Sequence, residues 1–156
     1  MAYCNVVICQ QATLSREAER PKVADAVIEA LAAYADAQQH DPTLSISTQR
    51  WNRLCWFGSL WDRAAAVLHA CEQAVTLAPD NGSVHQSRGV ARALIGNYNG
   101  AIADLQFFLS WGKAQQIDAA LIAKHQDWIE GLQAGRNPFD AATLEGLRQA
   151  EGETGR

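Results

Sequence analysis

Apolar residues recur at helical spacing soon after the start of the chain. Val23, Val27, Leu31 and Tyr34 lie three or four residues apart, which is typical of one face of a helix. Pro21 suits the first helical position, because the N–H that proline lacks would be unpaired there. Asp-Pro-Thr follows His40, and a residue before proline is driven out of helical geometry. We therefore predict a helix over residues 21–40.

The same period returns in later segments that are separated by clusters of turn-forming residues. The breaks fall at Gly58-Ser59, APDNG, GNYNG and GRNP. Ser83 and Asp140 stand where N-caps would lie, and Phe139 with Leu144 would form a hydrophobic staple. Helices are predicted over residues 49–57, 62–77, 83–95, 101–111, 117–134 and 140–150, with a frayed tail over 151–156.

Residues 1–20 do not fit this pattern. VVIC at residues 6–9 favours a strand by local propensity, yet a single strand has no partner in an otherwise helical chain. The structure of this segment stays open between a helix, a strand-like tail and an exchanged arm.

An internal repeat accompanies the helical pattern. ACEQAVTLAPDN at residues 70–81 parallels AYADAQQHDPTL at residues 33–44. Ala74 precedes Pro79 by the same interval as Ala37 precedes Pro42, and the two prolines are 37 residues apart (79 − 42). Such a period is typical of stacked helix-turn-helix units.

After Pro79 the pattern becomes specific. Residues 82–115 contain GNYNGA and an ordered series of small, apolar and aromatic residues: Gly89, Gly96, Tyr98, Ala101, Leu105 and Phe108. This segment resembles a tetratricopeptide repeat, a 34-residue helix-turn-helix unit. Each residue has a physical role in that resemblance. Gly89 and Ala101 would let two helices approach closely, Gly96 would permit the tight turn, and Tyr98 would fill the seam.

One unit earlier, the register places several residues of WNRLCWFGSLW at packing positions. Trp51, Leu54 and Cys55 fall on the first helix, and Cys71 with Ala74 falls on the second. The G-x-Y-x-x-A turn is missing here, and GSLWDRA sits at a longer spacing. The orientations of Trp56 and Trp61, towards a groove or towards the core, therefore stay open.

The resemblance implies an all-α solenoid of about three hairpins that forms one domain. Residues 1–44 would be a degenerate first repeat, 45–81 the second, 82–115 the third, and 116–150 capping helices, because such arrays need polar-faced ends. The chain also resembles a C-terminal segment of larger bacterial repeat proteins.

Composition excludes several classes of function. The 156 residues carry a net charge of -4, with no run of Lys or Arg that would bind nucleic acid. No apolar stretch is long enough to cross a membrane, and the N-terminus lacks the features of a secretory signal. We expect a cytoplasmic protein whose four cysteines are reduced thiols, since no CxxC pair is present.

No catalytic or metal-binding motif is present in the sequence. His69 and Cys71 are two residues apart, which would turn their side chains about 200° apart on a helix. His40, His85 and His125 have no partner at metal-ligand spacing, so solvated or capping roles are expected. Glycine-rich phosphate loops, G-x-S-x-G and paired carboxylates are missing. We expect no cofactor, no metal and no enzymatic activity, although a site assembled from distant residues would escape this search.

The resemblance places function on the concave face, which the first helix of each repeat forms. The predicted peptide contacts are Gln49, Asn52, Arg53, Trp56, Ser59, Leu60, Ser83, Gln86, Ser87, Val90, Ala93 and Leu94. Only Asn52 and Arg53 could serve a carboxylate clamp of the kind that binds chaperone tails. The expected partner is thus another protein or peptide, docked on Trp56 and Val90. In the alternative, Trp56 packs inside the repeat and the groove is empty.

Two further alternatives concern partners. Arg88 and Arg92 lie four residues apart, where they could contact an acidic partner or pair with Asp104 of the next helix. The whole chain could also be an accessory subunit that stacks end-on onto a larger protein or onto itself, without use of the groove.

Overall fold

The computed structural model describes the backbone of residues 6–154 and the side-chain surroundings of residues 22–151. All regular structure in that part of the chain is helical, as predicted. The helices are α1 (Val6–His40), α2 (Thr48–Leu60), α3 (Ala64–Leu77), α4 (Gly82–Leu94), α5 (Tyr98–Ala114), α6 (Ala119–Gln133) and α7 (Ala141–Thr154).

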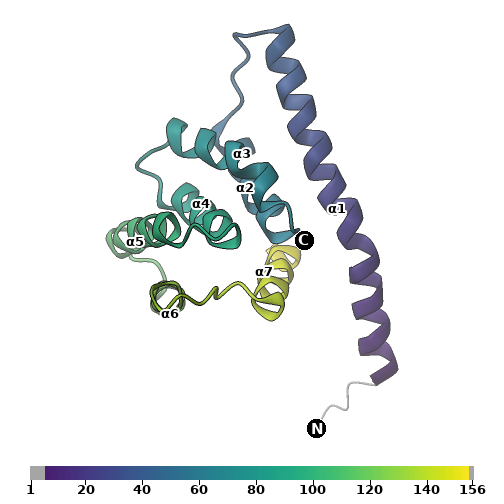
Figure 1. Cartoon of the computed structure of the whole chain (residues 1–156), viewed down its shortest axis with the longest axis vertical. Coiled ribbons are helices and arrows are strands. Elements are labelled where there is room, and N and C mark those ends of the chain that lie inside the picture. Colours follow the sequence, from purple (N-terminus) through teal and green to yellow (C-terminus); the bar gives the residue numbers. More distant parts are fainter. Residues whose placement is uncertain (1–5, 155–156) are drawn as a thin grey trace.

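Helices that follow one another in sequence pack together. α2 pairs with α3 and α4 with α5, and α4 also packs against both α2 and α3. α6 continues along α5, and α7 returns to contact α2, so that the chain curls back on itself (Figure 1). α1 lies beside α2 and α3, and its N-terminal part extends past the other helices.

Two clusters of buried apolar residues hold this arrangement. One joins α1, α2 and α3, and includes Trp51, Leu54 and Val67. The other joins the end of α2 to α4, α5, α6 and α7, and includes Leu60, Leu105 and Trp128. Trp51 is 4% exposed and Leu54 is 9% exposed, which confirms their predicted packing roles. Removal of such side chains from water is the main driving force for folding.

Three glycines allow close backbone approaches or a turn. Gly58 was expected to end a helix, but α2 continues to Leu60. A Cβ at Gly58 would collide with Val67, so this glycine lets α2 and α3 pack tightly. Gly89 lies against α5, where a Cβ would come 3.1 Å from Leu105 Cγ. Gly96 has φ 83° in the turn before α5, a conformation that glycine adopts without strain. The structure confirms the roles predicted for Gly89 and Gly96.

Several helix ends differ from the prediction. α1 begins at Val6 and continues through Pro21, so residues 6–20 are helical. Asn81, rather than Ser83, caps α4, because its side chain accepts a hydrogen bond from the Ser83 N–H. Asp140 acts as a cap as predicted, since it accepts from Thr143 N. α7 extends to Thr154, whereas we expected fraying from residue 151. Residues 1–5 and 155–156, part of the predicted arm and tail, lie outside the described residues.

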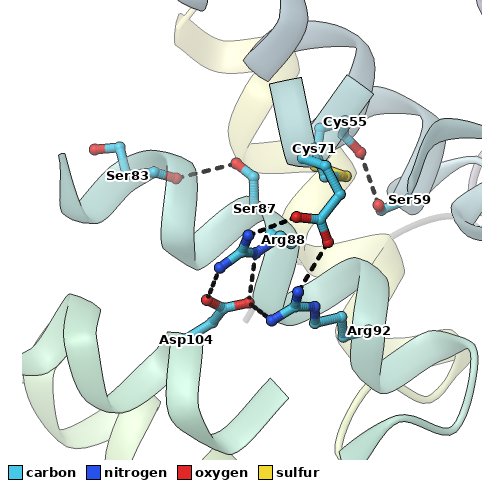
Figure 2. Close-up of a disulfide and its surroundings, with 9 residues drawn as sticks. Cys55, Ser59, Cys71, Ser83, Ser87, Arg88, Arg92 and Asp104 are labelled. Atoms are coloured by element: carbon cyan, nitrogen blue, oxygen red, sulfur yellow. Dashed lines mark hydrogen bonds and ion pairs between the residues drawn. A yellow bond between two sulfur atoms is a disulfide. The ribbon is translucent and has the colours of Figure 1, made fainter. Parts of the chain in front are cut away.

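Cys55 and Cys71 form a disulfide between α2 and α3 (Figure 2). The expectation of reduced thiols is therefore wrong for these two residues. Both are fully buried, and their Cα atoms are 4.8 Å apart. They occupy positions that the repeat register had placed on facing helices. Because the bond removes Cys71 as a nucleophile, it also excludes the dyad with His69.

No helix among residues 6–154 combines the length and the apolar character needed to cross a membrane. Among the residues whose side chains the structure describes, no cluster of three His, Cys, Asp or Glu residues could hold a metal ion.

Candidate functional site

A groove with a volume of about 560 Å³ runs between α2 and α4. Helical spacing of three and four residues places its wall residues on one face of each helix. Because α2 and α4 lie side by side, the two faces are brought together. The wall residues are Gln49, Asn52, Arg53 and Trp56 from α2, and Ser83, Gln86 and Ser87 from α4. All seven belong to the predicted set of concave-face residues.

The neutral polar side chains of the walls differ in whether they have hydrogen-bond partners within the chain. Asn52 Oδ1 is buried and has no hydrogen-bond partner. Gln86 Nε2 lies 2.8 Å from His125 Nε2 and donates to it, which holds the amide against α6. Ser87 Oγ donates to Ser83 O within α4. Asn52 therefore contributes an unsatisfied acceptor to the site, and unpaired buried polar atoms are uncommon in folded proteins.

Trp56 closes one end of the groove together with α7. Its indole Nε1 donates to Glu151 Oε1 over 2.9 Å, and Glu151 also lines the groove. The indole is half-buried and packs against the core cluster around Leu60. Trp56 thus contacts both the core and the groove, which were alternatives in the sequence analysis.

Five predicted groove residues do not line this groove. Ser59, Leu60, Val90 and Ala93 are fully buried, and Leu94 packs against the same core cluster. The prediction of Ser59, Leu60, Val90 and Ala93 as peptide contacts is wrong, because the packing of α5, α6 and α7 buries this part of α2 and α4. Leu94 is partly buried and does not line this groove. We had expected a peptide to dock on Val90, but its burial rules this out.

Arg88 and Arg92 belong to a network of ion pairs that joins three helices (Figure 2). Arg88 donates to Asp104 Oδ1 over 2.8 Å and to Glu72 Oε2 over 2.7 Å. Arg92 donates to Asp104 Oδ2 over 2.9 Å and to Glu72 Oε1 over 2.8 Å. Burial opposes the charge of Arg88, but the two carboxylates outweigh it and raise the pKa of the guanidinium. The predicted pairing with Asp104 is confirmed, so these arginines are engaged within the fold.

The histidines at positions 85 and 125 are buried, whereas we expected solvated or capping roles. His85 Nδ1 lies 3.0 Å from Asp104 Oδ1, and its Nε2 lies 2.8 Å from Pro79 O. His125 Nδ1 donates to Leu121 O over 2.8 Å, which leaves its Nε2 as the acceptor for Gln86. Burial lowers the pKa of His125 to about 4, so the ring is neutral near pH 7. Both histidines therefore have structural partners.

His125 also belongs to a series of aromatic contacts behind the groove. Its ring centroid lies 4.3 Å from that of Phe108 and 4.4 Å from that of Trp128. Trp128 in turn meets Phe139 at 4.8 Å. Such ring pairs add about 0.5–1.5 kcal/mol each beyond the area that they bury. The series fixes α6, and through the Gln86–His125 bond it supports the α4 wall of the groove.

Trp61 marks the place where α7 docks onto the end of α2. The Arg148 guanidinium lies over the Trp61 ring, 4.9 Å from its centroid. Arg148 Nε donates to Leu60 O over 2.7 Å, which satisfies a carbonyl in the last turn of α2. Trp61 thus packs on α7 outside the groove.

Two further residues, Phe57 and Glu151, line the groove and were not among the predicted contacts. Phe57 belongs to the quoted aromatic stretch, and its position one residue after Trp56 could have identified it. Glu151 is 95 residues from Trp56 in the chain, and no local pattern relates them. Only the return of α7 to α2 brings the two together.

A scan against protein-family models, a search of curated proteins and a search of solved structures each returned no match. Its function is therefore inferred from the geometry of this chain.

Proposed function

We propose that the chain is a non-enzymatic protein-interaction module of the tetratricopeptide type, which binds a peptide segment in the groove between α2 and α4. The observation that carries the proposal is the convergence of seven predicted wall residues on one groove of about 560 Å³. Such a volume is typical of ligand-binding sites.

The chemistry of the walls favours an extended peptide backbone. Asn52, Gln49 and Gln86 present amide groups that can donate to or accept from backbone C=O and N–H groups. Asn52 Oδ1 is buried without a partner within the chain, so rotation of this amide into the groove would let a peptide N–H satisfy it. Trp56 offers an aromatic edge at the end of the groove, and aromatic residues often dominate the energy of such interfaces.

The test begins with selection of peptides from a random twelve-residue display library on the purified chain. Enriched peptides are then titrated against the wild type, Trp56→Ala and Asn52→Ala. Gln126→Ala, at an exposed position of α6, is the matched control. We expect both groove variants to weaken binding about tenfold or more, and Gln126→Ala to leave it unchanged. Hydrogen exchange should show protection along α2 and α4. Enrichment of no peptide, or protection elsewhere, contradicts the proposal.

The long α1 gives one specific reason to keep the accessory-subunit alternative. Its N-terminal part extends past the rest of the fold (Figure 1), and this supports a contact with a larger partner or a second copy. Stacking of this kind predicts hydrogen-exchange protection along residues 6–20 on association, with α2 and α4 unchanged.

The Cys55–Cys71 disulfide provides a test of the compartment in which the module functions. Disulfides persist in oxidising compartments and are rare in the cytosol. In a cytoplasmic module, as expected from the sequence, Cys55 and Cys71 would be kept reduced. Rapid alkylation of the protein in its source cells, followed by peptide mapping of these two cysteines, distinguishes the two compartments.

A further inference from the structure

A second groove, with a volume of about 430 Å³, lies between α1 and α2. Its lining includes Val27 and Tyr34 from α1 together with Leu54 and Phe57 from α2. Arg50 and Arg53 also line it, three residues apart on the same face of α2. The groove therefore combines an apolar surface with two cations. It is distinct from the proposed peptide groove, although Arg53 and Phe57 line both.

The two arginines are available to a ligand. Arg63 pairs with Asp25, while Arg88 and Arg92 pair with Glu72 and Asp104. Within the described part of the chain, Arg50 and Arg53 have no such carboxylate, and both are exposed. The Arg53 guanidinium lies over the Phe57 ring, 5.6 Å from its centroid.

The size of this groove favours a small ligand over a docked helix. One turn of α-helix, with a diameter near 10 Å and a pitch of 5.4 Å, occupies roughly 420 Å³. The groove would therefore hold about one turn, whereas stable protein interfaces bury on the order of 1,200 Å² or more. Its volume nevertheless lies within the range of small-molecule sites.

We propose that the α1–α2 groove binds a small amphipathic carboxylate, with its aliphatic body against Val27, Leu54 and Phe57 and its carboxylate held by Arg50 and Arg53. Arginine matches a carboxylate with two parallel hydrogen bonds, which gives orientation as well as attraction. This site does not depend on the proposed peptide-binding function.

The test is a titration of the ¹⁵N-labelled chain with octanoate, followed by NMR. We expect saturable shifts at the amides of Val23, Ala26, Val27 and Leu54. Octan-1-ol, which has the same chain and no charge, should bind about tenfold more weakly. Absence of saturable shifts, or equal affinity for the alcohol, overturns the proposal.

Variants separate this groove from the peptide groove. Arg50→Ala should weaken octanoate binding about tenfold, and Arg50→Lys, which keeps the charge, should weaken it less. Gln86→Ala, in the peptide groove alone, is the matched control and should have no effect on octanoate. Because Arg50 is exposed, both Arg50 variants should keep the wild-type circular dichroism spectrum. Unchanged affinity in folded Arg50→Ala contradicts the proposal, and peptide binding by that variant tests the other groove independently.

Discussion

Trp56 and Glu151 are 95 residues apart in the chain, yet the indole N–H donates to the carboxylate over 2.9 Å. This bond joins the first helix of the groove to the last helix of the fold. It places α7 at the end of the groove, so the carboxyl-terminal segment is part of the candidate site.

Replacement of Glu151 by Ala should lower the free energy of unfolding by about 1 kcal/mol, because the half-buried indole N–H loses its acceptor. The tryptophan fluorescence of the chain, to which Trp56 contributes, should shift to longer wavelength as α7 loosens. Urea unfolding measures the first effect. Glu130→Ala, at an exposed position of α6, is the control, and an equal loss there would show that the Trp56 bond contributes nothing specific.

Reduction of the Cys55–Cys71 disulfide should lower the free energy of unfolding by about 3 kcal/mol. The bond closes a loop with a sequence separation of 16, and closure of such a loop restricts the unfolded chain. Urea unfolding with and without dithiothreitol measures the difference. The double variant Cys55→Ala, Cys71→Ala should not respond to the reductant. A similar response in that variant would assign the effect to another part of the chain.

Asp104→Asn should destabilise the chain by about 3 kcal/mol or more. Asp104 is 3% exposed, and the change would remove one of the two carboxylates that pair with Arg88 and Arg92, and the carboxylate that faces His85. Glu72→Gln is the comparison, since the Glu72 side chain is 43% exposed and solvent can replace it. The midpoint temperature of thermal unfolding of Asp104→Asn should be well below that of Glu72→Gln. The reverse order would show that Asp104 is not the main link between α4 and α5 in this network.

Stability should fall as the pH decreases from about 6.5 towards 4, through the protonation of His125. Its pKa is lowered to about 4 in the folded chain, compared with about 6.5 when unfolded. The unfolded state therefore binds more protons in this window, and the free energy of unfolding decreases by about 2–3 kcal/mol across it. His125→Gln should show a flatter pH profile in urea unfolding. His40→Gln, at the exposed end of α1, should keep the wild-type slope.

Two glycine substitutions should have opposite signs. Gly58→Ala should destabilise by about 1–3 kcal/mol, because the new methyl group would overlap Val67 across the α2–α3 contact. Gly146→Ala should stabilise by up to about 1 kcal/mol, since α7 is helical there and no described atom beyond the neighbouring turns of α7 lies within 4 Å of the added Cβ. Differential scanning calorimetry measures both. A neutral Gly58→Ala would contradict the tight packing of these helices.

Local patterns predicted the helical elements and most of the first wall of the groove. The helical period identified the helices after residue 20, because each apolar face must pack on a neighbour. The same spacing placed Gln49, Asn52, Arg53 and Trp56 on one face of α2. The helix over residues 6–20 was not predicted, since the β-branched residues of VVIC favour a strand locally.

The sequence by itself thus determined the helices after residue 20, the close approach at Gly89, and which side chains share a helical face, since these follow from spacing and residue size. Only the tertiary structure decided which of those faces stay open. α7 returns to α2, so Leu60 and Val90 are buried and Glu151 reaches Trp56. Burial and long-range pairing depend on how distant helices pack together, and that is a property of the whole chain and not of any local segment.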